Sequence, residues 1–147
     1  MAQPTTARFG KMRILLGDGG SPEAFTAPCG LTTKALTITK NLAEEAIPDC
    51  DDPDAPNWLA RDVQTMSASI TGEGLLAAES EAVWNAAAFS TEPLSVRLEI
   101  EFTAGTRLYE GMFHIDSFTP TGAQGSRITS SISMQSDGIV STNWTPA

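Results

Sequence analysis

The strongest constraint on this fold is the alternation of apolar and small polar residues in RITSSISMQSDG, residues 127–138. Successive side chains of a strand point to opposite faces. Ile128, Ile132 and Met134 therefore fall on one face, with Ser130 among them. The other face carries Arg127, Thr129, Ser131, Ser133, Gln135 and Asp137. The pattern predicts a strand with one face on a core and the other built mainly of small polar groups.

The same division recurs in two other predicted strands. In residues 63–71, Met66, Ala68 and Ile70 share one face, and residues 32–40 place Leu36 and Ile38 together. The opposite faces carry Thr65, Ser67, Ser69 and Thr71 in the first segment, and Thr37 and Thr39 in the second. One such face is ordinary, because Thr suits strands and polar residues face water. Repetition over three strands indicates a shared surface that is concave, or that lies beside something it must not hold.

Further segments predict the remaining strands. We expect strands at residues 8–16, 94–103 and 107–118, with turns at 17–22 and 104–106. Gly111 is a candidate bulge. The tail after residue 138 is expected to add a short edge segment.

Residues 75–89, LLAAESEAVWNAAAF, predict the one helix, because alanine dominates and β-branched residues are nearly absent. Leu76, Val83, Trp84 and Ala87 form a stripe that is expected to pack on a sheet. Strands, one helix and then hairpin-connected strands predict an α+β fold that is mainly antiparallel β. We expect a β-sandwich or barrel with a flanking helix, in one domain over residues 1–147.

Residues 41–62 are rich in proline and acidic residues and predict a long loop. Loops of this length are uncommon inside small domains and are usually either functional or disordered. Ile47, Trp58 and Leu59 are costly to leave in water, so we expect the loop to dock onto something.

Composition excludes several kinds of partner. Nine basic and eighteen acidic side chains give a net charge of −9, which argues against gripping nucleic acid phosphates and against an anionic membrane surface. No targeting segment and no membrane span is evident. Cys29 and Cys50 lack zinc-site spacing, and we expect them to be reduced, with a disulfide between them as the alternative.

No segment has the pattern of an active site, and no cofactor is expected. His114 and Asp116 would share a strand face, but no GxSxG segment supplies a nucleophile. The acidic run in residues 49–57 fails the EF-hand pattern, because Asp54 stands at the glycine position and Ala60 at that of the closing glutamate. We predict no catalytic residue and no metal site.

The chain resembles the major tail tube proteins of long-tailed phages and, most closely, those of phage-derived gene transfer agents. The resemblance is carried by RFGKMRILL, by the Pro- and Asp-rich segment before VQTMSASITGEG, by LLAAESEAVWNAAAF, by LSVRLEIEF, and by the closing YEGMFHIDSFTPTGAQGSRITSSISMQSDG. It covers nearly the whole chain and depends on the order of elements rather than on one motif.

The resemblance implies a structural subunit, not an enzyme. Six copies would form a ring around a continuous inner β-barrel, and stacked rings would form a tube. The 41–62 segment would contact a neighbouring subunit or ring, its acids meeting basic groups such as Lys34 or Arg61. The implied contact residues are Ile47, Pro48, Asp49, Asp51, Asp52, Asp54, Trp58 and Leu59. The lumen, or a packed subunit surface, would be lined by Thr65, Ser67, Ser69, Thr129, Ser131, Ser133 and Gln135.

The resemblance also implies partners and a location. The tube would surround a tape measure protein, meet terminator and distal tail or baseplate proteins, and conduct DNA without binding it specifically. It would be assembled in the bacterial cytoplasm and reside in a virion or phage-like particle, with no membrane partner.

Two other functions stay open from the residues alone. Trp58 and Trp144, together with Asp-rich loops, would suit a monomeric ligand- or carbohydrate-binding β-sandwich module. A small hydrolase that uses His114 is the other alternative.

Overall fold

The computed structural model describes residues 2–17 and 24–147, so the turn expected at 17–22 lies largely outside the described residues. The elements are η1 (Phe9–Lys11), β1 (Met12–Gly17), β2 (Phe25–Thr26), β3 (Leu31–Ile47), β4 (Trp58–Leu75), α1 (Ala78–Phe89), β5 (Leu94–Phe102), β6 (Gly105–Thr121), β7 (Thr129–Ser136) and β8 (Ser141–Pro146). All the pairings between these strands are antiparallel. The predicted α+β fold with a flanking helix is confirmed.

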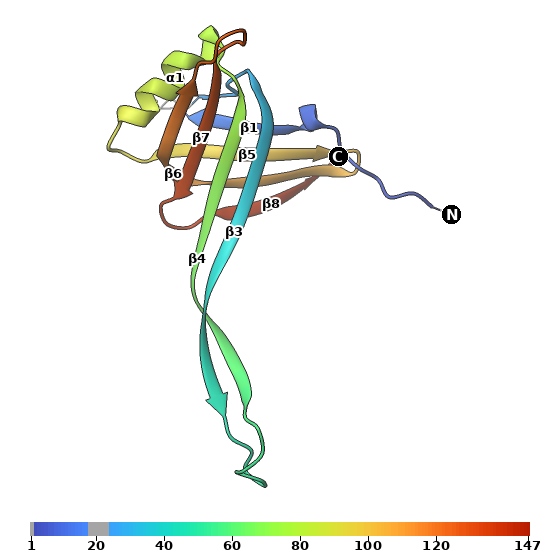
Figure 1. Ribbon diagram of the computed structural model, residues 1–147. Helices are drawn as coiled ribbons and strands as arrows, with labels where there is room; N and C mark the ends of the chain where they lie inside the picture. Colours follow the sequence, from blue (N-terminus) through green and yellow to red (C-terminus); the bar gives the residue numbers. More distant parts are fainter. Residues whose placement is uncertain (1, 18–23) are drawn as a thin grey trace.

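Strand β6 belongs to both layers of the fold (Figure 1). Its N-terminal half pairs with β5 on one side and with β8 on the other. Its C-terminal half, from Phe113 to Thr121, pairs with β7. The strand order β2-β1-β5-β6-β7-β4-β3 is therefore one sheet that folds over at β6. Figure 1 shows β1, β5 and β8 crossing the direction of β3, β4 and β7, as in a sandwich with crossed layers.

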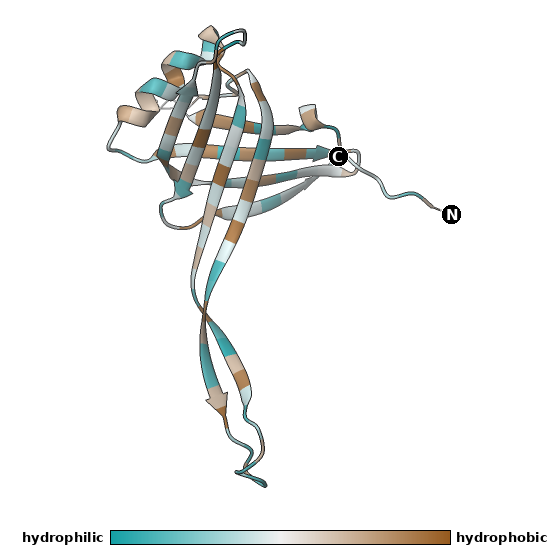
Figure 2. Cartoon of the chain, in the orientation of Figure 1, coloured by the Kyte–Doolittle hydropathy of each residue, from teal (hydrophilic) through white to brown (hydrophobic). Residues whose placement is uncertain are grey.

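The core lies between these layers, where the apolar positions of the alternating strands meet. Its buried side chains come from both layers and from the helix: Ile14, Leu16, Leu31, Ala68, Ile70, Trp84, Val96, Leu98, Phe113, Ile132 and Met134. Figure 2 shows the corresponding brown bands along the strands. Ser130 is also buried, as its place among the apolar positions predicts. Burying one face of β4 and β7 leaves their hydroxyl faces on the outside.

Three residues on the apolar faces of the predicted strands are exposed, and one of them is Ile38, at 50%. Ile128 is 53% exposed because β7 begins only at Thr129. Met66 is 62% exposed because it lies before Ser69, the residue at which the pairing of β4 with β7 begins. Alternation assigned the side of the strand correctly, but it carries no information on where the opposing layer ends.

Helix α1 begins at Ala78, three residues later than predicted, because Leu75 still belongs to β4. Trp84 is 1% exposed and joins the core, while Val83 stays partly in water, so the buried stripe is narrower than predicted. The buried Ser80 hydroxyl donates to the Cys29 carbonyl at 3.0 Å and ties the helix to the segment before β3. In the described chain no helix has the length and apolarity needed to cross a membrane.

The predicted loop at 41–62 is wrong in its bounds. Strands β3 and β4 stay paired as far as Ile47 opposite Trp58, and only residues 48–57 connect them. The three prolines of the predicted loop, at 48, 53 and 56, all lie in this connection, so the flanking segments keep the N–H groups that pairing requires. The result is a long twisted hairpin that projects from the body (Figure 1).

Other boundaries also differ from the predictions. The first strand starts at Met12 rather than at residue 8, since residues 9–11 form a 3₁₀ turn. Gly111 is not a bulge: it pairs in register with Val96, and a Cβ there would lie 3.1 Å from the Ile139 carbonyl oxygen. The irregularity of β6 lies instead between Ile115 and Ser117. Strand β8 pairs with β6, which confirms the expected edge segment.

Candidate assembly surfaces

The hydroxyl face predicted from three segments is one continuous surface on β3, β4, β7 and the C-terminal half of β6, which we call the hydroxyl sheet. Paired residues share a face, so the register places side chains in rows across the strands. The rows are Thr33, Glu73, Ser131 and Thr119; Ala35, Thr71, Ser133 and Ser117; and Thr37, Ser69, Gln135 and His114. Thr39 and Ser67 extend the face along β3 and β4, with Thr65 beyond them. Glu73 is the one carboxylate in the three rows.

One end of the hydroxyl face is hollowed. A cavity of about 450 Å³ lies there, and its lining includes Thr33, Glu73, Thr119, Thr121 and Ser131. The structure therefore brings Thr129, Ser131, Ser133 and Gln135 of β7 onto the same surface as Thr65, Ser67 and Ser69 of β4. The sequence identified these side chains but not the contribution of β6.

In the described chain neither margin of the hydroxyl sheet is paired with a further strand, although helix α1 also packs against β6; we call such unpaired margins open. There β3 pairs only with β4, and residues 114–121 of β6 pair only with β7. Open margins expose rows of backbone N–H and C=O groups, which are a template for pairing with another chain. These two margins did not follow from sequence reasoning, because they depend on which strands end up as neighbours.

The direction of individual backbone groups follows from one hydrogen bond. The Ala68 N–H donates to the Ser136 hydroxyl on β7 at 2.9 Å, so even-numbered N–H groups in this part of β4 point toward β7 and odd-numbered ones toward β3. By the same alternation, Thr37 directs its backbone groups to β4, while Leu36 and Ile38 direct theirs to the open margin. The same alternation continues through β7 to β6, where it directs the backbone groups of Pro120 away from β7 and toward the open margin. The N–H that proline lacks is therefore not one that the sheet needs for a hydrogen bond.

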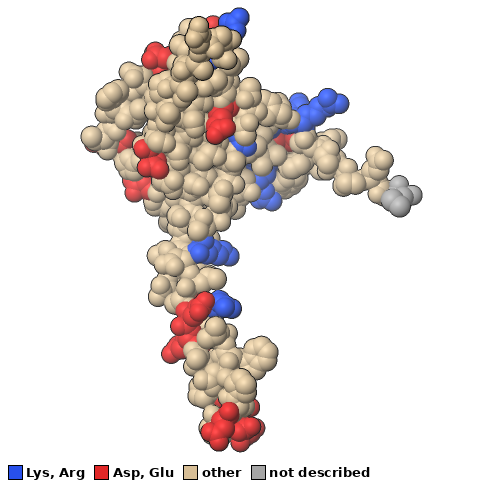
Figure 3. Space-filling model, in the orientation of Figure 1, with Lys and Arg blue, Asp and Glu red and all other residues tan. Residues whose placement is uncertain are grey.

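The projecting hairpin is the most acidic part of the molecule. Residues 40–63 contain seven acidic and two basic side chains, and Figure 3 shows the acidic groups gathered at the tip. Arg61 is engaged within the hairpin, its Nε lying 3.3 Å from Glu44 Oε1. Arg61 is therefore already paired within its own chain, so it is a weaker candidate partner for a neighbour's acids.

Apolar side chains accompany the acids at the tip. Trp58 is 86% exposed, and Ile47 and Leu59 are each about half exposed. Together with Pro48 and Asp49 they line a notch of about 300 Å³. The predicted contact residues are thus brought together at one end of the hairpin, where an isolated chain leaves them in water.

The acids of the tip are arranged for a turn rather than for a metal. The Asp51 N–H donates to Asp49 Oδ1 at 2.9 Å, and the Ala55 N–H donates to the Asp52 carbonyl at 3.0 Å. Within residues 2–17 and 24–147, no group of three His, Cys, Asp or Glu side chains is placed to hold a metal ion. Cys50 at the tip and Cys29 are both free and exposed.

His114 meets a different carboxylate from the one its sequence spacing suggests. Its Nε2 lies 3.3 Å from Asp137 Oδ2, while the irregularity after Ile115 takes Asp116 out of register. The pair is exposed. The two tryptophans of the alternative binding module are also separate, since Trp58 borders the hairpin tip opposite Ile47, whereas Trp144 lies on β8 with its ring against Phe102.

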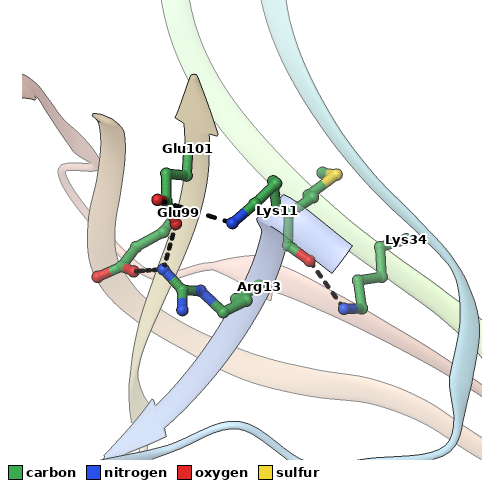
Figure 4. A network of polar contacts seen from close by, with 6 residues as sticks. Lys11, Arg13, Lys34, Glu99 and Glu101 are labelled. Atoms are coloured by element: carbon green, nitrogen blue, oxygen red, sulfur yellow. Dashed lines mark hydrogen bonds and ion pairs between the residues drawn. The ribbon is translucent and has the colours of Figure 1, made fainter. Parts of the chain in front are cut away.

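Basic side chains gather around η1 and β1 (Figure 4). Arg13 Nη2 lies 3.3 Å from both Glu99 Oε2 and Glu101 Oε2, and Lys11 Nζ lies 3.9 Å from Glu101 Oε1. Lys34 donates to the Met12 carbonyl at 2.8 Å. Burial, and secondarily the positive charge of Arg13, lowers the pKa of Lys34.

An apolar groove of about 600 Å³ lies where the hairpin leaves the body. Ile38, Met66, Tyr109, Ile139 and Val140 contribute to its lining, which contains no charged side chain. Sequence alternation could have indicated Ile38 and Met66, but not that the opposing layer stops short of them.

Comparisons with known proteins agree with this architecture. In the tail of an empty gene transfer agent (GTA) particle with C6 symmetry, one chain has 20% identity and a TM-score of 0.76, with 94% of this chain and 99% of that chain covered. A chain of the native GTA virion has 20% identity over the same shares, with a TM-score of 0.69. The SPP1 tail tube has 13% identity and a TM-score of 0.62, covering 95% of this chain and 80% of that one. These likenesses show the fold.

Family membership follows from sequence. No curated protein matches the chain significantly. The family described as "Phage tail tube protein", which is a structural and not an enzyme family, matches residues 7–142. The chain belongs to the phage tail tube protein family.

Proposed function

We propose that six copies of this chain, each acting as one tail-tube domain, close into a ring by joining their hydroxyl sheets margin to margin. The observation that carries the proposal is that both margins of the same sheet are open. The β3 margin of one copy would pair with residues 114–121 of β6 in the next. Because these margins differ, the contact is heterologous and generates a ring when the rotation closes. The C6 symmetry of the structurally similar GTA tail supports the number six.

The hydroxyl face lines the channel of this ring. The other face of the sheet is occupied by the core, so only the hydroxyl face is free to border a lumen. Its side chains are short and mostly uncharged, and Glu73 adds one carboxylate per copy. DNA is a dense line of negative charge that binds through clustered Lys and Arg. A wall of hydroxyls with a few carboxylates offers it no such grip, so DNA would pass without being held.

Stacked rings form the tube, and the hairpin contacts a neighbouring subunit or ring. Ile47, Trp58 and Leu59 would be its apolar anchors, as aromatic residues often are at interfaces. Pro48, Asp49, Asp51, Asp52 and Asp54 would form the acidic part of this contact. The tube would enclose a tape measure protein before DNA, and would meet terminator and distal tail or baseplate proteins at its ends. Assembly would take place in the bacterial cytoplasm, and the product would be part of a virion or phage-like particle.

A backbone substitution at the β3 margin tests the ring. Ile38→Pro removes an N–H that points to the open margin, and Ile38→Val is the control that keeps it. We expect Ile38→Pro to remain a folded monomer by circular dichroism and to form no rings or tubes on electron micrographs, while Ile38→Val assembles. Normal tubes from folded Ile38→Pro would contradict pairing at this margin.

A further inference from the structure

A hollow beside the N-terminal segment has the opposite chemistry to the hairpin tip. It consists of two adjoining cavities that share Phe102 and Thr103, one of about 270 Å³ and one of about 540 Å³. Thr6, Ala7, Arg8, Lys11 and Glu101 complete the lining of the first, and Thr5, Ala104 and Trp144 that of the second. We call this site the Phe102 hollow.

The floor of the Phe102 hollow is aromatic. The rings of Phe102 and Trp144 pack with their centroids 6.4 Å apart. The Arg107 guanidinium carbon lies over the Trp144 ring, 5.2 Å from its centroid. A floor of this kind offers apolar area to an incoming aromatic or aliphatic side chain.

The rim of the Phe102 hollow is basic. Arg8 and Lys11 line the rim, and Arg107 lies over the Trp144 ring of the floor. Arg13 is ion-paired with Glu99 and Glu101 beside the rim. Arg13 and Lys11 share those two carboxylates, whereas Arg8 has no ion pair with the described residues. The rim thus keeps an excess of positive charge in a chain whose net charge is −9.

We propose that the Phe102 hollow receives the acidic hairpin tip of a second copy of this chain. The inference rests on the proposed function, since it names the surface that the hairpin contacts. The tip matches the hollow on both counts: its aspartates suit the basic rim, and the exposed Trp58, Ile47 and Leu59 suit the aromatic floor.

The hairpin tip cannot reach the hollow of its own chain. Figure 1 shows the tip at the far end of a hairpin that runs away from the body, while η1 and the β5–β6 turn lie on the body itself. The occupant therefore has to come from another molecule. A tip-to-hollow contact joins two different surfaces, so it can be repeated along a stack without limit.

A cross-link through the native thiol of the tip tests the contact. In a Cys29→Ser background, Thr103→Cys places a thiol in the hollow opposite the natural Cys50 of a neighbour. We expect mild oxidation of assembled tubes to give a ladder of linked chains on a non-reducing gel. The same protein with Cys50→Ser is the matched control and should give none. Tubes that give no ladder would contradict the contact between tip and hollow but not the proposed function. A wild-type chain that never polymerises would contradict both.

Complementary charge reversals test the chemistry. Asp51→Lys/Asp52→Lys in the tip, and Arg8→Glu/Lys11→Glu in the hollow, should each raise the concentration needed for tube assembly at least about tenfold, because like charges would then face each other. Mixing the two variants should restore assembly, since the tip of each variant then meets a hollow of opposite charge on the other variant. Glu79→Lys/Glu81→Lys on α1 is the matched control and should assemble normally. Failure of the mixture to assemble would contradict the proposal. The proposal would also be contradicted if the wild-type chain bound an oligonucleotide and Arg8→Glu/Lys11→Glu abolished that binding without affecting assembly.

Discussion

At the scale of single residues, period-2 alternation assigned sides of strands well. Ala68, Ile70, Ile132 and Met134 are buried as predicted, and their hydroxyl neighbours line the opposite face. It failed at Ile38, Met66 and Ile128, because exposure there is decided by where the opposing layer and the strand end. Local rules also could not show that Gly74 is required for a close approach between β3 and β4.

Gly74 is the residue at which a methyl group should be most costly. A Cβ there would overlap the Gly30 carbonyl oxygen and would lie 2.6 Å from the Thr32 nitrogen, and backbone atoms cannot move aside cheaply. We expect Gly74→Ala to lower the free energy of unfolding by about 1–3 kcal/mol, the range of overpacking changes. Urea denaturation measures this. Gly122→Ala is the control, because nothing lies within 4 Å of a Cβ there, and equal stability of the two variants would contradict the close approach.

Lys34 should make stability depend on pH in the alkaline range. Its pKa is lowered in the fold, first by burial and then by Arg13, from the ordinary value of 10.5. Between the folded and unfolded values the unfolded chain binds more protons, so stability rises with pH through this window. We expect the melting temperature of the wild type to rise with pH through this window, and that of Lys34→Met to rise less. An identical pH dependence in both proteins would contradict the assignment.

At the scale of elements, the sequence predicted type better than extent. β5 and its hairpin with β6 were found because alternation and turn signals agree there, and the helix because alanine dominates residues 77–88. The hairpin of β3 and β4 was mistaken for a loop, because prolines and acids concentrated in its ten-residue tip outweighed the weak strand signal of its flanks. Long-range pairing, which local propensity does not contain, extends the two strands.

Replacing the hairpin tip should separate folding from assembly. Ile47 and Trp58 are paired, so residues 48–57 can be exchanged for Asn-Gly, which suits a two-residue hairpin turn. The tip makes no core contact, and we expect the melting temperature to stay near that of the wild type while tube formation is lost. Calorimetry and electron microscopy measure the two effects. Normal tubes from the shortened chain would refute a role of the tip in assembly.

At the scale of the whole molecule, the account depends on the two open margins of one sheet. The order of elements, and its resemblance to tail tube proteins, led to the family from sequence. Which strands form the margins could not be predicted, because β6 changes partners halfway along its length and only the folded topology shows where. The hydroxyl face can border a channel only because those margins can pair with neighbouring copies. In a sheet without open margins it would be an ordinary solvent-exposed surface.

The most direct measurement is electron microscopy of the purified wild-type chain at high protein concentration. The account predicts hollow tubes built of sixfold rings, with the hydroxyl sheets of neighbouring copies hydrogen-bonded from β3 to β6 around the channel. A chain that stays monomeric, or rings whose channel is lined by another surface, would contradict it.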